Sequence, residues 1–404
     1  MLGFLGVFAQ DTGQKIFKPN VRSLKVYNPN NFMAPDIIRN ATSDRLIINF
    51  DIIGEDPLFL RYRLIHCNSD WKPSRLMESE YIDGFNEVMI EDYAYSNNTY
   101  IHYVNYNIEL PDPQLPVLAS GNYLLQVFSE EDPDDILLQT RFSLSEELSF
   151  VAGGITTKTD KGVNSDFQQL FLNIDLSNLP NINPYQDLIV TVMQNNRPET
   201  TKTLSHPLRV QAGHAIFEHN PDMIFEAGNE YRRFETVRTD YPGMNVDSVK
   251  FINGIWNAWI KNDFSRKHRE YNFDSTQHGR FKIDEYNSTD PDLSADYVMV
   301  HFSLDPGERQ FGKIYVDGDF TNHRFDKSNL LEYDWEDGLY HASIPLKQGS
   351  YNYQYVVIPE NGKTPSVSAI EGNKYETRNE YLIKVFLRTP GSRGDRLIGT
   401  AQIF

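Results

Sequence analysis

Short segments in which every second residue is apolar recur along this chain, and they constrain its fold more than any other feature. Three segments show the pattern clearly, with apolar residues at Leu46, Ile48, Phe50 and Ile52; at Leu170, Leu172, Ile174 and Leu176; and at Val298, Val300, Phe302 and Leu304. A spacing of two residues is typical of a strand with one buried face. Many short strands separated by turn residues, without helical periodicity between them, predict an all-β protein made of sandwiches.

The length of 404 residues corresponds to about three domains at roughly 150 residues each. We therefore expect three consecutive antiparallel β-sandwich domains of immunoglobulin-like type. The first should span 18–146, because the strand Thr140–Leu144 is followed by polar Ser145-Glu146-Glu147. The second should span 147–290 and close in the polar stretch 287–292, and the third should span 291–404. The segment 253–261 fits a strand or a helix equally well.

The first nine residues have the character of an export signal. Met1 to Phe8 is apolar and is followed by the small residue Ala9, as at the end of a secretory signal. We expect 1–9 to be the remnant of such a signal, with the true start upstream; the alternative is an ordinary first strand. No later stretch approaches the roughly 18 apolar residues of a membrane-spanning helix, so we expect no membrane insertion.

The charge balance excludes one class of partner. The chain has 38 basic and 56 acidic residues and a net charge of −18. Nucleic acid is therefore not an expected partner, because its binding depends on lysine and arginine displacing counterions. An acidic surface keeps a protein dispersed in solution, and a basic protein partner is the remaining alternative.

The single cysteine, Cys67, follows His66 directly. No internal disulfide can form, so the fold depends on its apolar cores. Neighbouring residues in a strand point to opposite faces, so His66 is badly placed to activate the thiol. We therefore expect Cys67 to be a buried structural residue, as most free cysteines are.

Other candidate motifs are better explained as turns. Gly362-Lys363-Thr364 ends like a phosphate-binding loop, but Val357 stands where that loop needs its first glycine. The acidic run 130–135 lacks the spacing of a calcium loop and is expected at an exposed hairpin tip. Asp317-Gly318-Asp319 is likewise predicted to be a turn.

The sequence also lacks the zinc-protease and serine-hydrolase motifs HExxH and GxSxG. We therefore expect a protein that is not an enzyme, with no catalytic residues, metal ligands, cofactor or small-molecule substrate. A glycosidase-like pair among the acids stays open as an alternative. The four tryptophans, Trp71, Trp256, Trp259 and Trp335, are expected to fill cores or sandwich corners, with interface anchors as the alternative.

Several distinctive segments stand together with this pattern. They are Tyr62–Trp71 with Pro73-Ser74, Tyr81–Phe85, Asp92-Tyr93, Ser120–Tyr123, Gly228–Glu235 and Glu371–Thr377. In these segments the chain resembles the type IX secretion system plug protein family, from about Val21 to Phe404. The resemblance implies a periplasmic accessory, peripherally associated with the outer membrane of a Bacteroidetes-type bacterium. Such a protein would bind the giant outer-membrane β-barrel translocon and cap its periplasmic mouth.

A second resemblance covers Lys313 to Val357, which looks like a glycogen- or starch-binding module of the early-set immunoglobulin type. It suggests an alternative function as a periplasmic glycan-binding protein. The family's sugar-stacking tryptophan would fall near Asn322-His323, where this chain has none. We therefore expect a shared fold without shared sugar binding.

Overall fold

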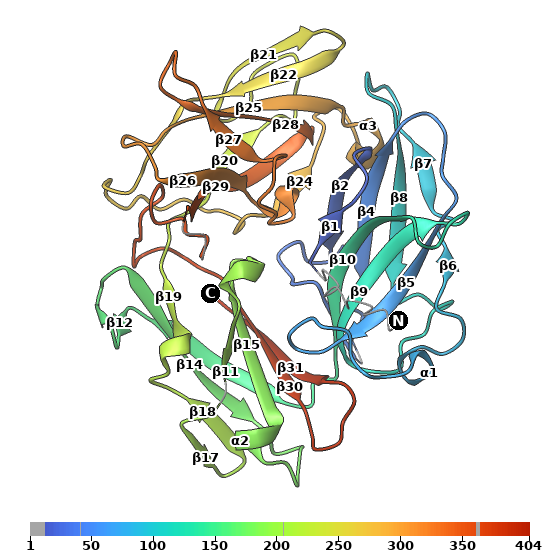
Figure 1. Ribbon diagram of the computed structural model, residues 1–404, viewed down its shortest axis with the longest axis vertical. Coiled ribbons are helices and arrows are strands. Elements are labelled where there is room, and N and C mark those ends of the chain that lie inside the picture. The colour runs from blue at the N-terminus through green and yellow to red at the C-terminus, as the bar shows by residue number, and fades with distance from the viewer. Residues whose placement is uncertain (1–12, 41, 205, 361–363) are drawn as a thin grey trace, which may run out of the picture.

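The computed structural model describes residues 13–404 except 41, 205 and 361–363. It contains three β-sandwiches, each of which contacts the other two (Figure 1). The export-signal prediction for residues 1–9 and most of the turn predicted at 362–364 lie outside the described residues. No helix among the described residues is long and apolar enough to cross a membrane.

The first sandwich packs a six-stranded sheet on a four-stranded one. The larger sheet contains β1 (Lys15–Ile16), β10 (Ile136–Ser145), β9 (Gly121–Ser129), β5 (Leu60–Cys67) and β6 (Val88–Met89), with β3 (Ile37–Arg39) beside β10. The smaller contains β2 (Val21–Tyr27), β4 (Leu46–Ile53), β8 (Tyr103–Leu110) and β7 (Tyr93–Tyr95). A single helical turn, α1 (Glu78–Tyr81), follows β5.

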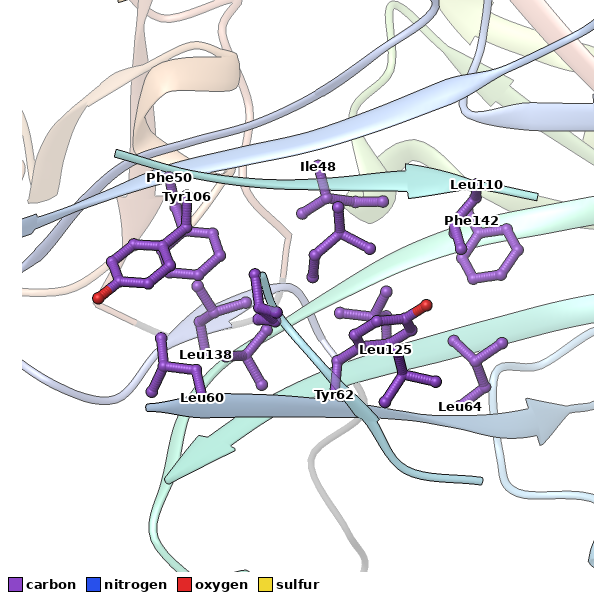
Figure 2. Close-up of a cluster of buried hydrophobic side chains, with 14 of the residues drawn as sticks. Ile48, Phe50, Leu60, Tyr62, Leu64, Tyr106, Leu110, Leu125, Leu138 and Phe142 are labelled. Atoms are coloured by element: carbon purple, nitrogen blue, oxygen red, sulfur yellow. The ribbon is translucent and has the colours of Figure 1, made fainter. Parts of the chain in front are cut away.

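Figure 2 shows the core between these two sheets. Ile48 and Phe50 of β4 face Leu60, Tyr62 and Leu64 of β5, and all are buried. Phe50 stacks on Tyr106 with ring centroids 5.3 Å apart. The predicted alternation in β4 is confirmed: its apolar positions form the inner face.

The second sandwich is built from two distant parts of the chain. One sheet contains β11 (Phe150–Thr156), β14 (Phe167–Asp175), β18 (His214–Phe217) and β17 (Arg209–Gln211), with β19 (Ile224–Glu226) beside β14. The other contains β16 (Lys202–Leu204), β15 (Leu188–Gln194), β30 (Tyr381–Leu387) and β31 (Arg396–Ile403). Short elements complete it: the hairpin of β12 (Lys158–Thr159) and β13 (Gly162–Val163), and α2 (Pro184–Asp187), η1 (Pro198–Thr200) and η2 (Pro221–Met223).

The third sandwich is a ten-stranded sheet folded over on itself. Its strands are β20 (Arg232–Glu235), β29 (Gly349–Pro359), β26 (Gly312–Asp317), β27 (Leu330–Tyr333), β28 (Tyr340–Lys347), β25 (Tyr297–Asp305), β22 (Ile255–Ile260) and β21 (Val246–Ile252), with β23 (Asp263–Phe264) and β24 (Phe281–Ile283) alongside. Strand β27 pairs with β26 and then with β28, so it passes from one layer to the other. The elements α3 (Pro291–Ser294) and η3 (Asp319–Thr321) lie in its loops.

The strand pairing shows that the domain limits predicted for the second and third sandwiches, 147–290 and 291–404, are wrong. Strand β30 pairs with β15 along its whole length, and Ile383 and Val385 share a core with Val190 and Val192. The third sandwich, from about residue 228 to 378, is therefore inserted into the second, and the three domains are not consecutive. The polar stretch 287–292 lies in a loop between β24 and β25, inside the third sandwich.

Other strand predictions are confirmed. The patterned segment 170–176 lies in β14 except for Leu176, which follows the strand, the segment 298–304 lies in β25, and the undecided segment 253–261 contains strand β22. Most strand pairs are antiparallel, while β3–β10, β22–β25 and β23–β25 are parallel.

Candidate functional site

Buried polar groups join the first sandwich to the third. Lys347 of β28 places its Nζ 2.7 Å from Asp51 Oδ2 of β4, and both side chains are essentially inaccessible to solvent. The Tyr297 hydroxyl donates a hydrogen bond of 2.7 Å to the same carboxylate oxygen. Asp296 accepts hydrogen bonds from the backbone amides of Tyr100 and Ile101. Burial lowers the pKa of Lys347, although the charge of Asp51 opposes that effect.

The first and second sandwiches meet at a different carboxylate. Asp395 accepts a hydrogen bond of 2.8 Å from the Ser69 amide and forms a bidentate ion pair with Arg388, at 2.6 and 2.7 Å. Burial alone would raise the pKa of Asp395, but the hydrogen bonds from Arg388 and Ser69 hold it below its usual value. Gly121 also matters here, because a Cβ at this position would lie 2.4 Å from His66 Nε2 and 3.0 Å from the Asp395 carbonyl oxygen.

One ion pair lies where all three sandwiches meet. Arg280 of the third sandwich forms a bidentate pair with Glu380 of the second, at 2.7 and 3.0 Å. Gln402 of β31 donates hydrogen bonds to Glu380 and to the Met33 carbonyl oxygen of the first sandwich. Both charged side chains are buried, so this joint is shielded from solvent.

The two chain segments that enter and leave the third sandwich run side by side. The Lys374 amide donates to the Gly228 carbonyl, and the Gly228 amide donates to the Asn373 side chain. Glu371 forms ion pairs with Arg232 and Arg266, and its carboxylate is buried. Burial would raise the pKa of Glu371, but the two guanidinium groups lower it. The segments 228–235 and 371–377, distinctive in the sequence, thus form one doubly connected joint.

The turn predicted at 317–319 contains a buried charged group. His323 donates from Nδ1 to Asp317 at 3.0 Å and from Nε2 to Asp319 at 2.9 Å. Burial would lower the pKa of His323, but the two carboxylates raise it well above its ordinary value. The imidazole is thus held between two acids, and its side chain is only 6 % exposed.

A cleft runs between the three sandwiches. One cavity of about 600 Å³ lies between the outer faces of β10 and β30 and the segment after η3; its lining includes Trp71, Arg141, Thr203, Phe325 and Lys384. A second of about 310 Å³ shares Asp36, Asn196, Asn322 and His323 with the first. Burial and the charge of Asp319 raise the pKa of Asp36 to about 7.

The four tryptophans lie outside the fully buried cores. Trp71 is half-buried at a corner between sandwiches, as expected, and Trp256 and Trp259 are half-buried on β22. Trp335 is 74 % exposed, so its predicted burial is wrong. It lies in the turn between β27 and β28, where it contacts Tyr333 and lies under the Arg309 guanidinium at 4.7 Å.

Large apolar side chains are exposed on each sandwich. Phe85 on the first is 92 % exposed, Phe311 on the third is 87 % exposed, and Leu208 on the second is also exposed. Aromatic residues are enriched in the energetically important parts of protein interfaces. These positions are therefore candidate contacts for a partner.

Cys67 and the acidic run 130–135 lie in the surroundings that the sequence predicts for them. Cys67 is fully buried, and burial raises the pKa of its thiol to about 12, so it is unreactive in the folded state. The His66 Nε2 atom lies 3.0 Å from the Ser120 carbonyl oxygen. The acidic run 130–135 forms the exposed tip of the β9–β10 hairpin.

The described residues bring one group of possible metal ligands together: Asp334, Asp337 and His341 at the β27–β28 turn, with ligand atoms within 4.8 Å of one another. His341 Nε2 already lies 2.8 Å from Asp337 Oδ2. Two of the three residues are exposed, so we interpret the group as part of the turn.

Sequence reasoning did not identify the charged residues at the joints. Asp51 lies in the apolar strand LIINFDII and Lys384 in YLIKVFL. The charged residue itself was the signal that could have identified each position, because most of its neighbours in the strand are apolar. Their partners, such as Lys347 for Asp51, come from distant parts of the chain.

Comparison with known proteins agrees with this architecture. Residues 21–146, which include nearly all of the first sandwich, match the family model of the type 9 secretion system plug protein 1st domain. The crystal structure of a hypothetical protein from Parabacteroides merdae is similar over 96 % of this chain and 98 % of its own, with 35 % identity and a TM-score of 0.94. A search of curated proteins finds no match. Residues 21–146 therefore carry the first domain of the type 9 secretion system plug protein family, and the likeness to the Parabacteroides merdae protein extends over the rest of the chain.

Proposed function

We propose that this protein is a non-catalytic accessory subunit of the type IX secretion system, located in the periplasm and peripherally associated with the outer membrane. It binds the giant outer-membrane translocon and covers its periplasmic mouth. The match of the first domain to the plug protein family supports an association with the secretion machinery, and the covering role rests on the architecture.

The observation that carries this proposal is the rigid union of three sandwiches. Buried ion pairs or charge-assisted hydrogen bonds join each pair of sandwiches, through Lys347–Asp51, Asp395–Ser69 and Arg280–Glu380. Breaking such a buried pair costs several kcal/mol, so independent movement of the domains is disfavoured. A body that covers a wide opening needs this resistance to deformation and needs no reaction chemistry.

The contact with the translocon can be tested by photo-crosslinking in living cells. A photoreactive amino acid is placed at Phe85, Leu208 or Phe311, one exposed position on each sandwich. We expect at least one of them to capture a large outer-membrane protein that mass spectrometry identifies as the translocon. Exposed Lys158 gives a polar control position. Capture from none of the three apolar positions, or equal capture from Lys158, would count against the proposal.

The covering role has a separate test. Deletion of the gene should raise the entry of large antibiotics that intact outer membranes exclude, and the intact gene should restore the barrier. A different outcome is that the protein crosslinks to the translocon while the deletion strain shows no permeability change and no second gate is detected. That result would support the translocon as partner and contradict the covering role.

A further inference from the structure

A separate cavity lies at the joint between the second and third sandwiches. Its volume is about 430 Å³, within the range of roughly 300–1,000 Å³ typical of ligand pockets, which are common at domain junctions. The third sandwich contributes Glu230, residues 273–276 and His278 to the wall, and the second contributes Asn379 and Phe404. The cavity shares no lining residue with the two cavities of the central cleft.

Glu230 is held in the wall by one of its two carboxylate oxygens. The Tyr271 hydroxyl and the Arg378 backbone amide donate hydrogen bonds to Glu230 Oε1, at 2.8 and 3.1 Å. The other oxygen, Oε2, accepts no hydrogen bond from the described residues, although Glu230 is only 2 % exposed. Native proteins rarely leave a buried polar atom without a partner. Because Glu230 lines the cavity, a ligand there would find a fixed acceptor.

His278 is a second buried polar side chain in the same wall. It is 8 % exposed, and neither ring nitrogen has a hydrogen-bond partner among the described residues. Its ring packs against Phe404, with centroids 6.1 Å apart. Burial lowers the pKa of His278; the charge of Glu380 opposes this shift, and that of Arg280 adds to it. The neutral imidazole offers a ligand one donor and one acceptor.

The charges on the wall nearly balance. Asp274 forms a bidentate ion pair with Arg233, at 2.6 and 3.1 Å. Glu230 and Arg378 remain and carry opposite charges. The cavity therefore favours a ligand without net charge over an anion or a cation.

Two aromatic side chains add apolar surface to this polar wall. Phe273 and Phe404 are both exposed and both line the cavity. Ser275 and Thr276 lie beside them, and Thr276 Oγ1 is buried without a partner among the described residues. A sugar suits such a wall, because its hydroxyl groups both donate and accept hydrogen bonds while its C–H groups contact aromatic rings.

We propose that this cavity binds a neutral sugar of one or two rings. Hydroxyl groups of the sugar donate to Glu230 Oε2 and form hydrogen bonds with His278, and its apolar face contacts Phe273 or Phe404. The site lies outside the segment Lys313 to Val357, none of whose residues lines the cavity. It is also separate from the proposed covering of the translocon, and either can hold without the other.

Calorimetry on the purified full chain provides the test. The probes are glucose, galactose, N-acetylglucosamine, maltose and cellobiose. Cyclohexanol, a six-membered ring with a single hydroxyl group, is the control ligand. We expect at least one sugar to bind and cyclohexanol not to bind. His278→Phe keeps a ring against Phe404 and removes both nitrogens, so it should weaken binding by about tenfold, as expected for the loss of one or two hydrogen bonds.

Variants at exposed positions separate binding from folding. Phe273→Ala should weaken binding and leave the melting temperature unchanged, because this side chain is exposed. Its matched control is Phe264→Ala, which changes another exposed phenylalanine beside an arginine, Arg269, outside the lining and should leave the affinity unchanged. Ser275→Trp places a large side chain at an exposed position of the lining and should abolish binding.

Nuclear magnetic resonance gives a readout that locates the sugar. In protein with ¹³C-labelled histidine, the bound sugar should shift the resonance that His278→Phe removes. The proposal is overturned if none of the sugars binds at tens of millimolar concentration, or if cyclohexanol binds equally well. Sugar binding that survives Ser275→Trp, or that is unchanged in both His278→Phe and Phe273→Ala, would place the sugar elsewhere on the protein and would equally overturn it.

Discussion

Replacement of Lys347 by methionine should loosen the joint between the first and third sandwiches. The change leaves the Asp51 carboxylate buried without its cation, while Tyr297 and Asn105 still donate hydrogen bonds to it. Removing one partner of a buried pair typically costs about 3–5 kcal/mol. Because two donors remain, we expect the lower end, about 3 kcal/mol, which corresponds to a roughly 150-fold change in an equilibrium constant.

Cys67 provides the assay. It is the single cysteine and is fully buried in the first sandwich, so a thiol reagent reaches it only when that sandwich opens. When reclosing is faster than reaction, the labelling rate follows the open population. Lys347→Met should therefore increase the labelling rate of Cys67 by roughly 150-fold.

Matched variants show whether the buried pair is responsible. Lys282→Met removes an exposed ion pair with Asp284 and should change the rate by no more than about fivefold. Asp51→Asn alone should resemble Lys347→Met, while the double variant should be closer to wild type than either single variant, because no buried charge remains unpaired. Labelling rates within about threefold of wild type for both single variants would refute this account.

Three further predictions concern single residues. Phe50→Ala should lower the free energy of unfolding by about 4 kcal/mol, because it empties a fully buried, stacked position; the exposed Phe171→Ala should change the urea midpoint little. Gly121→Ala should lower the melting temperature, because its φ of +146° disfavours a side chain and the new Cβ would meet His66; an unchanged melting temperature would contradict this. Asp36→Asn should be more stable than wild type at pH 8 and equal to it near pH 4. The raised pKa of Asp36, about 7, means that wild-type stability falls as pH rises from the ordinary value of 3.8 to about 7. Parallel pH profiles of the two proteins in chemical denaturation would exclude that role for Asp36.

The strand pattern predicts the local structure well, because the alternation of apolar residues follows directly from the geometry of a half-buried strand. Leu46 to Ile52 and Val298 to Leu304 form inner faces as expected. The pattern carries no information about which strand is the neighbour. The pairing of β15 with β30 spans nearly half the chain, and no feature of either strand identifies the other.

Polarity was a poor guide to domain limits for a related reason. The polar stretch 287–292 looks like a linker, yet the Asp292 carbonyl accepts a hydrogen bond from buried Lys347. Asp51 and Lys384 lie on the faces of their strands opposite the cores, where solvent would be expected. Neighbouring sandwiches cover both positions, and strand periodicity cannot detect that cover.

Segments that are distinctive in the sequence meet at the joints between sandwiches, although no single residue in them indicates this. Gly228–Glu235 and Glu371–Thr377 lie far apart in the sequence and meet at the joint between the second and third sandwiches. Asn68, Ser69 and Trp71 lie at the joint between the first and second. Three of the distinctive segments therefore supply contacts that fix the sandwiches relative to one another.

The insertion of one sandwich into another sets an order of assembly during synthesis. Strands β30 and β31 complete the second sandwich and emerge only after the whole inserted unit. Until β30 is synthesised, one edge of β15 lacks its hydrogen-bonded neighbour and can pair with other strands. The apolar side chains of Val190 and Val192 also lack part of their core. In a chain cut short after residue 378, the first and third sandwiches could still form, but the second would lack two strands. Proteases and chaperones would then act on the incomplete second sandwich of an otherwise folded molecule.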